Sequence, residues 1–345
     1  MAAALWSILN ARLGAVPDPA AAGVEGASLP PCLIVNPLSF RASRGLAQEA
    51  CELARARGAE VVSIDSPAAL SAAVETILAR RQRKVMVLAG DGTVRAVVEQ
   101  LAALPAGAWI PDLLVLPGGR TNLIANDLIP GAAALDLLRR ALAPAHRWDA
   151  SIAERFTLCI EQDGAPARHG FWVGAALIDS VIRRTHEHRA GGTGALRTGH
   201  LSTVAALLGL ASKALRGRSG LTAPRLRVRA GAAGVLMEGP VSLLVATTLH
   251  HRKGLFDPYV SRAADDLRLT AVSRHADRFW ACLPRLLTGR FSPAMDPAHG
   301  YVSGSFARVE ITGVAGYSLD GEAYDADPQR PLILRRGTRL RFVVA

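Results

Sequence analysis

Two glycine-rich turns in this sequence carry residues that are suited to binding a charged group. The first turn reads Gly90-Asp91-Gly92-Thr93 and the second spans Pro117 to Asn122, and each follows a short apolar run and opens onto a helical pattern. Glycines let a backbone approach a ligand closely, and the N–H groups at the start of the following helix supply donors and a partial positive charge. In the second turn, Arg120 and Asn122 add side-chain donors. The pattern predicts a site for phosphate groups.

The carboxylate of Asp91 repels phosphate, so its expected role is through magnesium, a ribose or a bound water. The alternative is a tight turn between a strand and a helix, in which Asp91 or Thr93 caps the helix. The residues of this turn alone leave both interpretations open. The sequence contains neither a G-x-x-x-x-G-K-[ST] loop nor a complete G-x-G-x-x-G, so the standard nucleotide-binding motifs do not apply.

A third turn lies near the far end of the chain. Asp320 and Glu322 stand on either side of Gly321, in a turn at the end of a predicted strand that includes Tyr317, Ser318 and Leu319. An aspartate held in a cleft can take a proton from an attacking hydroxyl group or help to hold magnesium. A D-G-E sequence is also typical of a simple hairpin turn, and this interpretation stays open beside the catalytic one.

The elements that would position the first two turns follow a regular alternation. Short continuous apolar runs alternate with helical patterns, as expected for βαβ units and a parallel sheet covered on both faces. The predicted strands are 33–35, 61–64, 85–88 and 113–116, and the predicted helices are 44–57, the segment from Ser66-Pro67, 94–104 and stretches up to Leu142. Both glycine-rich turns then fall at the carboxyl ends of parallel strands, where open α/β sheets bind ligands.

Beyond Trp148 the pattern changes to short strand-like runs separated by Gly, Pro and Asp. These runs predict a mainly antiparallel β domain, with strands at 157–160, 226–228, 241–246, 267–272, 307–311 and 340–344 and helices at 175–188, 201–215 and 276–287. The expected domains are a flexible tail at 1–28, an α/β nucleotide-binding domain at 29–147 and a β-rich domain at 148–345.

Composition narrows the class of protein. The chain has 345 residues and a formal net charge of +11, nearly all from arginine, and only 5% of its residues are aromatic. No apolar run approaches the roughly 18–20 residues of a membrane span, and no secretory leader is recognisable, so we expect a cytoplasmic protein. Nucleic acid is not an expected partner because no recognition pattern for it is present.

The cysteines are widely spaced, and Cys32 and Cys159 lie in apolar runs that predict buried thiols.

The turns and one earlier segment together carry a family resemblance. The sequences NPLS at 36–39, GDGT at 90–93, PGGRTN at 117–122 and LDGE at 319–322 occur in this order along the chain. This set resembles the diacylglycerol kinase catalytic family, which includes sphingosine and ceramide kinases and bacterial lipid kinases. The resemblance extends over roughly residues 31 to 345. Its specificity lies in the combination, because GDGT also occurs in the related NAD kinases.

The resemblance implies a Rossmann-like, NAD-kinase-like α/β domain followed by a β-sandwich domain, with ATP and Mg²⁺ bound between them. It also implies that the β-rich domain at 148–345 is the lipid-substrate domain. It implies that Asp320 acts as a general base or magnesium-linked carboxylate, and that Asp91 shares the catalytic and metal-binding roles. The remaining residues that it places at the nucleotide and its phosphates are Asn36, Ser39, Arg41, Arg44, Gly90, Gly92, Thr93, Gly119, Arg120, Asn122 and Glu322.

Four residues depart from the family pattern. Phe40 and Ala89 each replace a usual glycine, Arg120 replaces a usual threonine and Leu123 a usual aspartate, while Asp127 lies one helical turn beyond Leu123 and could compensate for it. The leading hypothesis is an ATP-dependent lipid kinase that phosphorylates the primary hydroxyl group of a lipid. Diacylglycerol is the first candidate acceptor, and ceramide or a sphingoid base is the second. The alternatives are a catalytically impaired nucleotide- or lipid-binding relative and a soluble-substrate kinase of the NAD type.

A lipid acceptor implies contact with a membrane surface. Apolar stripes flanked by basic residues occur at 201–218 and 278–291, and each predicts either a helix packed on the second domain or a surface that docks on an anionic membrane. We therefore expect a cytoplasmic protein that associates peripherally with the inner face of the membrane. A homodimer is a further expectation.

Overall fold

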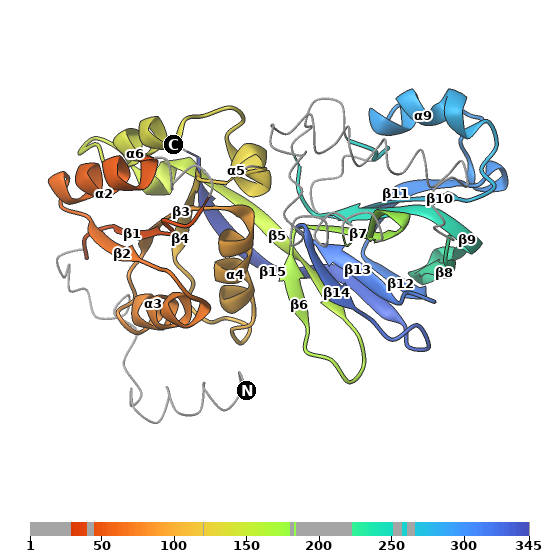
Figure 1. Ribbon diagram of the computed structural model, residues 1–345, viewed down its shortest axis with the longest axis horizontal. Helices are drawn as coiled ribbons and strands as arrows, with labels where there is room; N and C mark the ends of the chain where they lie inside the picture. Colours follow the sequence, from red (N-terminus) through yellow and green to blue (C-terminus); the bar gives the residue numbers. More distant parts are fainter. Residues whose placement is uncertain are drawn as a thin grey trace.

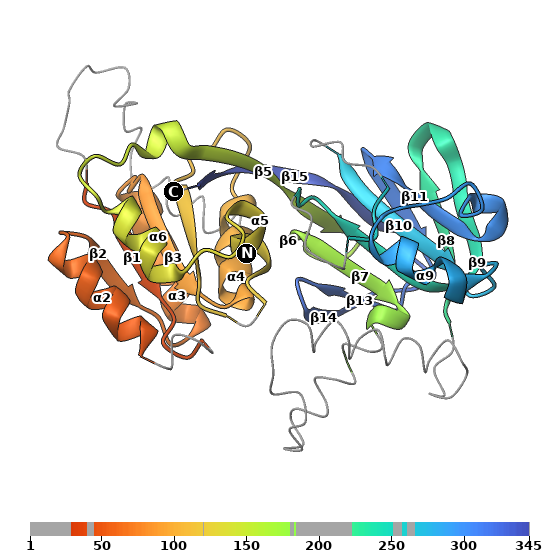
Figure 2. The same cartoon turned by 90° about the horizontal axis from the view of Figure 1, so that it is seen from above.

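The computed structural model describes residues 29–39, 45–119, 121–179, 183, 223–250, 257–260 and 266–344. Two regions lie side by side, an α/β region and a β-rich region, and the long strands β5 (Ile152–Glu161) and β15 (Leu332–Val343) run between them (Figure 1). Seen from above, these two strands form the bridge that joins the regions (Figure 2).

The α/β region contains a parallel sheet in the order β4-β3-β1-β2. Its strands are β1 (Cys32–Val35), β2 (Glu60–Ser63), β3 (Lys84–Ala89) and β4 (Asp112–Pro117), and its helices are α2 (Leu46–Ala56), α3 (Pro67–Ala79), α4 (Asp91–Ala102), α5 (Leu123–Leu128) and α6 (Ala134–Ala141). The predicted strands and helices of this region are confirmed, with ends that differ by a few residues.

Alternate residues of each central strand pack on opposite faces of this sheet. Leu33, Met86 and Leu88 are buried against α2 and α6, whereas Ile34 and Val87 are buried against α3 and α4. Because a strand points successive side chains to opposite sides, a sheet covered on both faces needs apolar residues at every position. This requirement explains the continuous apolar runs of the sequence.

Local signals set the ends of two of these helices. The Oγ of Ser66 accepts a hydrogen bond from the N–H of Ala69 at 3.3 Å, and Pro67 occupies the first turn of α3. Gly58 follows α2 with φ of 76°, a left-handed conformation that glycine adopts without strain. Both features agree with the capping signals in the sequence.

The β-rich region is a sandwich of mainly antiparallel strands around one apolar cluster. Besides β5 and β15, its elements are η3 (Trp148–Ser151), β6 (Arg168–Gly170), β7 (Trp172–Ala176), β8 (Arg225–Ala230), η4 (Gly231–Ala233), β9 (Gly234–Thr247), β10 (Leu267–Ser273), α9 (Phe279–Leu287), η5 (Pro297–His299), β11 (Tyr301–Phe306), β12 (Arg308–Thr312), β13 (Gly316–Leu319) and β14 (Glu322–Asp325). Strand β9 takes part in both sheets, because it pairs first with β8 and then with β7 and β10.

The last strand returns to the α/β region. Residues Arg341 and Phe342 of β15 pair in parallel with Asp112 and Leu113 of β4, while most of β15 pairs antiparallel with β5. Phe342 is fully buried in the apolar cluster beneath β1 and β3. The parallel sheet therefore gains its last neighbour from the far end of the described chain.

The predicted helices of the second region had mixed outcomes. Helix α9 packs Cys282 and Leu286 on Val272 and Tyr301 of the sandwich, which favours the packing role for this apolar stripe. The prediction of a helix from residue 175 was wrong at its start, because Ala175 and its neighbour end β7. The rest of that prediction, apart from 177–179 and 183, and the helix at 201–215 with its basic stripe lie outside the described residues.

The cysteines are free thiols, and Cys32 and Cys159 are buried as predicted. Burial raises the pKa of each of these two thiols to about 11. Within the described part of the chain, no helix is long and apolar enough to cross a membrane.

Candidate active site

The two glycine-rich turns lie against each other at the carboxyl edge of the parallel sheet. Strands β3 and β4 end in register, with Ala89 opposite Pro117, and the N–H of Gly118 donates to the carbonyl oxygen of Ala89 at 3.1 Å. A Cβ atom at Gly119 would lie 2.7 Å from the Cα of Gly90. Packing of backbone on backbone therefore requires glycine here, independently of any ligand.

The carboxylate of Asp91 ties the first turn to the second. Its Oδ2 accepts a hydrogen bond from the N–H of Asn122 at 2.7 Å, and its Oδ1 accepts one from the N–H of Leu123. These are N–H groups at the start of α5, so Asp91 caps a neighbouring helix. Gly90 is the cap residue of α4 itself, with no side-chain cap bond. Asp91 is therefore a helix cap, as one of the two interpretations predicted, but it caps α5 and not the helix that it begins. The metal-binding and catalytic roles of Asp91 stay predictions.

Asn122 stabilises the second turn from within. It adopts a left-handed conformation with φ of 48°, its Oδ1 accepts a hydrogen bond from the N–H of Gly119 at 2.8 Å, and its Nδ2 donates to the carbonyl oxygen of Gly119 at 3.1 Å. The side chain is buried and its polar atoms bond within the turn. Arg120 lies outside the described residues.

The segment after β1 joins the same site. The Nδ2 of Asn36 donates to the Oγ1 of Thr93 at 2.8 Å, and the Oγ of Ser39 accepts a hydrogen bond from the N–H of Gly90 at 2.9 Å. Asn36 and Ser39 are therefore in contact with the first turn, as their place in the motif set predicts. Phe40, Arg41 and Arg44 lie outside the described residues.

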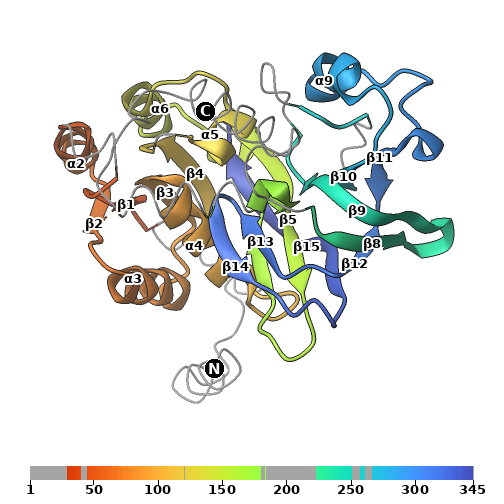
Figure 3. The ribbon, with the colours of Figure 1, turned by 45° about the vertical axis from the view of Figure 1, so that its right-hand side comes forward.

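The third turn reaches this edge from the β-rich region. Asp320 and Gly321 have φ of 50° and 93°, and they form the two-residue loop between β13 and β14 that type I′ hairpins require. The hairpin interpretation is therefore correct, and it does not exclude a catalytic role. This hairpin lies beside the amino-terminal end of α4 (Figure 3), where a Cβ atom at Gly92 would be 3.0 Å from the Oε1 of Glu322.

Backbone donors hold the carboxylate of Asp320 in place. The N–H of Trp172 donates to its Oδ1 at 2.8 Å, and the N–H of Phe171 lies 3.1 Å from both of its oxygens. A Cβ atom at Gly170 would lie 2.5 Å from Oδ2, so only glycine leaves room for this carboxylate. Sequence reasoning missed the segment 170–172 because main-chain donors leave no side-chain signature.

Asp320 has a pKa suited to proton transfer. Burial raises the pKa of its carboxyl group from 3.8 to about 7, and the nearby charge of Asp91 adds to the rise. The bonds from Trp172 and Phe171 and the charge of Arg95 oppose the rise in pKa. A carboxylate with a pKa near neutrality is basic enough to accept a proton and is still largely ionised just above pH 7.

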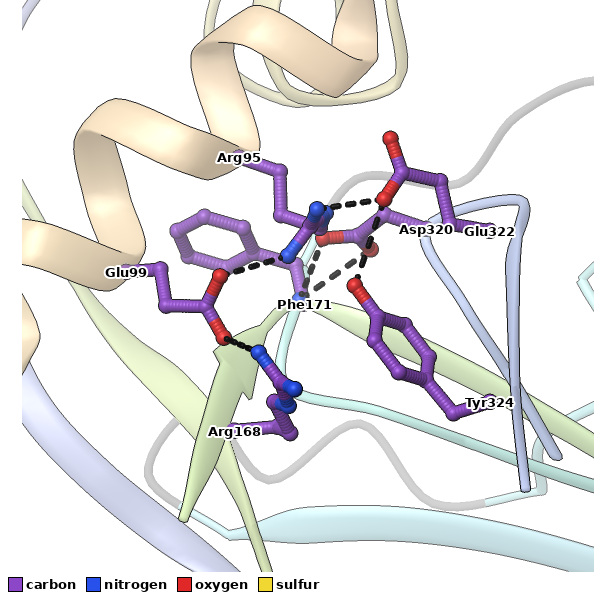
Figure 4. A network of polar contacts seen from close by, with 7 residues as sticks. All are labelled: Arg95, Glu99, Arg168, Phe171, Asp320, Glu322 and Tyr324. Atoms are coloured by element: carbon purple, nitrogen blue, oxygen red, sulfur yellow. Dashed lines mark hydrogen bonds and ion pairs between the residues drawn. The ribbon is translucent and has the colours of Figure 1, made fainter. Parts of the chain in front are cut away.

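A network of charged side chains connects α4 to this hairpin (Figure 4). The guanidinium of Arg95 pairs with the carboxylates of Glu99, at 2.8 Å, and of Glu322. Glu99 also pairs with Arg168 of β6 at 3.4 Å, and the hydroxyl of Tyr324 donates to Glu322 at 3.2 Å. Since α4 and the hairpin come from different regions, these contacts fix α4 relative to Asp320.

Leu123, which departs from the family pattern, and the nearby Asp127 both have structural roles. The main-chain N–H of Leu123 bonds to Asp91, and its side chain packs against the apolar cluster of the α/β region. Asp127 is buried, and its oxygens bond to the Nε of Arg155 and to the N–H of His250, both at 2.8 Å. Asp127 therefore faces the β-rich region, and the idea that it compensates for Leu123 is not supported.

The carboxylates fit a metal only in part. Among the described residues there is no group of three or more His, Cys, Asp or Glu side chains that could hold an ion. Asp91 raises the pKa of Asp320 through its charge, so a divalent cation near both would relieve their repulsion. Mg²⁺ in kinases is bound by one or two carboxylates, substrate phosphates and water. The donor set fits such an ion when a nucleotide brings most of its ligands.

Comparisons with known proteins agree with this geometry. Residues 30–149 match the model of the diacylglycerol kinase catalytic domain. No curated protein matches the chain by sequence. A crystal structure of a diacylglycerol kinase from Bacillus anthracis strain Sterne is similar in fold, with a TM-score of 0.59 and 12% identity over 92% of this chain and 98% of that one.

Two further structures from the same strain, named as candidate diacylglycerol kinases, are similar to the same degree. Their TM-scores are 0.63 and 0.61 and their identities 13% and 14%, each over 93% of this chain and over 97% and 99% of theirs. These likenesses show the fold, with an α/β half and a β-sandwich half. Through the match at residues 30–149, the α/β half of the chain is similar to the diacylglycerol kinase catalytic domain.

Proposed function

We propose that this protein transfers the γ-phosphoryl group of ATP to the primary hydroxyl group of a lipid. The observation that carries the proposal is the position of Asp320. Its carboxylate has a pKa of about 7 and is held by main-chain donors beside the two glycine-rich turns. This arrangement combines a general base with a phosphate site, which is what transfer to a hydroxyl group needs.

The first turn would bind the phosphates. The N–H groups of the first helical turn of α4 have no acceptor within the helix and point towards its amino-terminal end. Asn36 and Ser39 bond to Thr93 and to the N–H of Gly90, and so they fix the shape of this turn. Asp91 would act by holding the second turn against the first. When bound, Mg²⁺ would neutralise charge on the phosphates.

Asp320 would accept the proton of the acceptor hydroxyl group. As the proton moves to a carboxylate oxygen, the hydroxyl oxygen forms its bond to the γ-phosphorus and the bond from that phosphorus to the bridging oxygen of ADP breaks. The N–H groups of Phe171 and Trp172 keep the carboxylate aimed and ionised. Arg95 would position the hairpin through Glu322 and keep the pKa of Asp320 from rising further.

Diacylglycerol is the first acceptor that we propose, and ceramide or a sphingoid base the second. The family match supports a lipid as the acceptor. We propose that the protein works while bound peripherally to a membrane surface.

A lipid-panel assay tests the proposal. Purified protein would be incubated with Mg²⁺ and ATP labelled at the γ-phosphate, in mixed micelles with diacylglycerol, ceramide, sphingosine or no lipid, and with NAD as a soluble acceptor. We expect labelled lipid with wild type and a loss of about 10²-fold or more with Asp320→Asn. Asp136→Asn, an exposed change on α6, is the matched control. Label in no lipid, or full activity of Asp320→Asn, would refute the proposal.

The positions of Leu123 and Asp127 favour a second candidate, a nucleotide-binding relative with impaired turnover. Neither residue offers the carboxylate oxygen that the family places next to this turn. Thermal stabilisation by ATP and Mg²⁺ without transfer to any acceptor would identify this case. Transfer to NAD alone would instead identify a soluble-substrate kinase.

A further inference from the structure

A basic cavity lies at the edge of the parallel sheet opposite the glycine-rich turns. Its volume is about 420 Å³, within the range of small-molecule sites. Lys84 begins β3, whereas Gly90 follows the other end of the same strand, so the length of the sheet separates the cavity from the proposed active site. The residues that line the cavity are Leu29, Arg81, Arg83, Lys84, His146, Arg147, Trp148 and Asp149.

Positive charge is in excess in this lining. Four of its residues are cations, Arg81, Arg83, Lys84 and Arg147, and Asp149 is its carboxylate. Arg83 is held by Asp149 at 2.5 Å and by the buried Asp112 at 3.2 Å. No carboxylate pairs with Lys84 or Arg147 among the residues that the structure describes. These two side chains therefore keep their charge available to a ligand.

Trp148 and Arg83 are held in place before any ligand binds. The indole of Trp148 is buried and donates to the carbonyl oxygen of Ala141 at 3.0 Å, which anchors the neighbouring His146, Arg147 and Asp149. Arg83 of the lining pairs with the buried Asp112, which also pairs with Arg341 at 2.7 Å. A preorganised site loses little side-chain entropy when it binds.

His146 reports the electrostatic environment of the cavity. Burial lowers the pKa of its imidazole, and the charges of Lys84 and Arg140 lower it further. The ring is therefore neutral at pH 7, and its pKa depends on how much positive charge surrounds it. An anion in the cavity would offset that charge and raise the pKa of His146.

We propose that this cavity is a second anion site, which binds a phosphate group between Lys84 and Arg147 with Arg83 as the fixed wall. A phosphate dianion matches the charge of the two available cations, and guanidinium and ammonium groups are its usual ligands. The group could belong to a small soluble phosphate or to a phosphomonoester lipid headgroup. The site is independent of the phosphoryl transfer proposed above, because it lies at the other edge of the sheet.

Histidine NMR on the full chain tests the site directly. The ring signal of His146 would be assigned by its loss in His146→Gln, and its pKa measured with and without inorganic phosphate and pyrophosphate. We expect pyrophosphate to raise this pKa by about half a unit or more, a shift that binding at the glycine-rich turns would not produce. The variant Lys84→Met/Arg147→Gln should bind pyrophosphate at least about ten-fold more weakly than wild type does.

The control is the variant Arg139→Gln/Arg308→Gln, which removes two exposed arginines outside the cavity. Its net charge therefore changes by the same amount as that of the Lys84/Arg147 variant. Co-sedimentation with phosphatidylcholine vesicles, with and without phosphatidic acid, tests the headgroup source with the same variants. A rise in the pKa of His146 with soluble anions would support a free phosphate as the ligand. Co-sedimentation with phosphatidic acid vesicles that is lost in the Lys84/Arg147 variant, and kept in the control, would support the lipid headgroup. No response in either assay, or an equal response in the Lys84/Arg147 variant and wild type, would overturn the proposal.

Discussion

The guanidinium of Arg95 on α4 pairs with the carboxylate of Glu322 in the β13–β14 hairpin, across the boundary between the two regions. The two partners differ in burial, since the Arg95 side chain is 8% exposed and that of Glu322 is 44% exposed. Arg95 also lies 5.6 Å from the centroid of the Tyr324 ring. Removing the carboxylate would leave a buried cation with fewer partners, whereas removing Arg95 would leave Glu322 with access to water.

The first prediction concerns this arginine and the pH dependence of transfer. Asp320 must be ionised to accept a proton, so kcat/KM should rise with pH through an acid limb near pH 7. Because the charge of Arg95 lowers the pKa of Asp320, Arg95→Gln should move this limb to higher pH. We also expect a loss of about 1–3 kcal/mol in the free energy of unfolding. A pH–rate profile and denaturant unfolding would measure the two effects.

Arg95→Lys is the matched control because it keeps the charge while losing the two-sided pairing. It should retain the acid limb near its wild-type position even if the protein is less stable. An unmoved limb in Arg95→Gln would contradict the electrostatic role of Arg95 and leave only a packing role.

The second prediction separates activity from stability at Asp320. The folded-state pKa of this group is raised from 3.8 to about 7, so its contribution to stability is full below the unfolded pKa and is lost as pH rises through 7. Asp320→Asn should therefore be inactive and yet more stable than wild type at pH 8, by on the order of 1 kcal/mol, or roughly 2–4 °C in Tm. The gain should shrink towards pH 4. Thermal unfolding at both pH values checks this, and a variant less stable at pH 8 would show that the carboxylate is not destabilised by burial.

The third prediction concerns the bond between the two turns. Asp91→Ala removes both acceptors for the N–H groups of Asn122 and Leu123. We expect a loss of about 1–2 kcal/mol in the free energy of unfolding, as for other lost helix caps. Glu75→Ala, an exposed acidic position on α3, is the control. If Asp91→Ala abolished transfer with no loss of stability, Asp91 would act on the substrate or a metal instead.

The fourth prediction tests the contact between the two turns at its closest point. Gly119→Ala would place a methyl group 2.7 Å from the Cα of Gly90, so the turns must separate, at a cost of about 1–3 kcal/mol. In Gly90→Ala the new methyl group would lie 3.7 Å from the Cα of Gly119, an ordinary contact, and should cost much less. Comparing the Tm of the two variants measures the difference. Equal losses would contradict the packing argument for Gly119.

The α/β region was predictable because burial on both faces leaves a continuous apolar run at each strand and a helical pattern between strands. In the β-rich region, β6, β7 and β11 were missed as strands, whereas the D-G-E sequence indicated the β13–β14 hairpin. Strand β6 contains only Arg168, His169 and Gly170, and no apolar run marks it. Ala175 read as the start of a helix because alanine favours helices, but it pairs with Leu244 in the sandwich. Ladder pairing with distant residues outweighs local propensity there.

The motifs located the candidate site, but not how it is held together. No local pattern indicates that Asp91 caps α5, or that Asn122 bonds within its own turn. The sequence also does not show that Gly170 makes room for Asp320, because the two are brought together only by the pairing of β7 with β13. Side-chain types and order along the chain predict which residues meet, and the tertiary pairing decides which atoms bond.

The return of β15 to the parallel sheet affects how the protein folds during synthesis. Strand β4 pairs with β3 on one side, but its other neighbour is the end of β15, which the ribosome makes long after β4. Until then one edge of β4 is open, and an open strand edge is a site for pairing with other chains. The α/β region therefore cannot complete its sheet as an independent early unit, and a nascent chain stalled before residue 340 would be prone to aggregation.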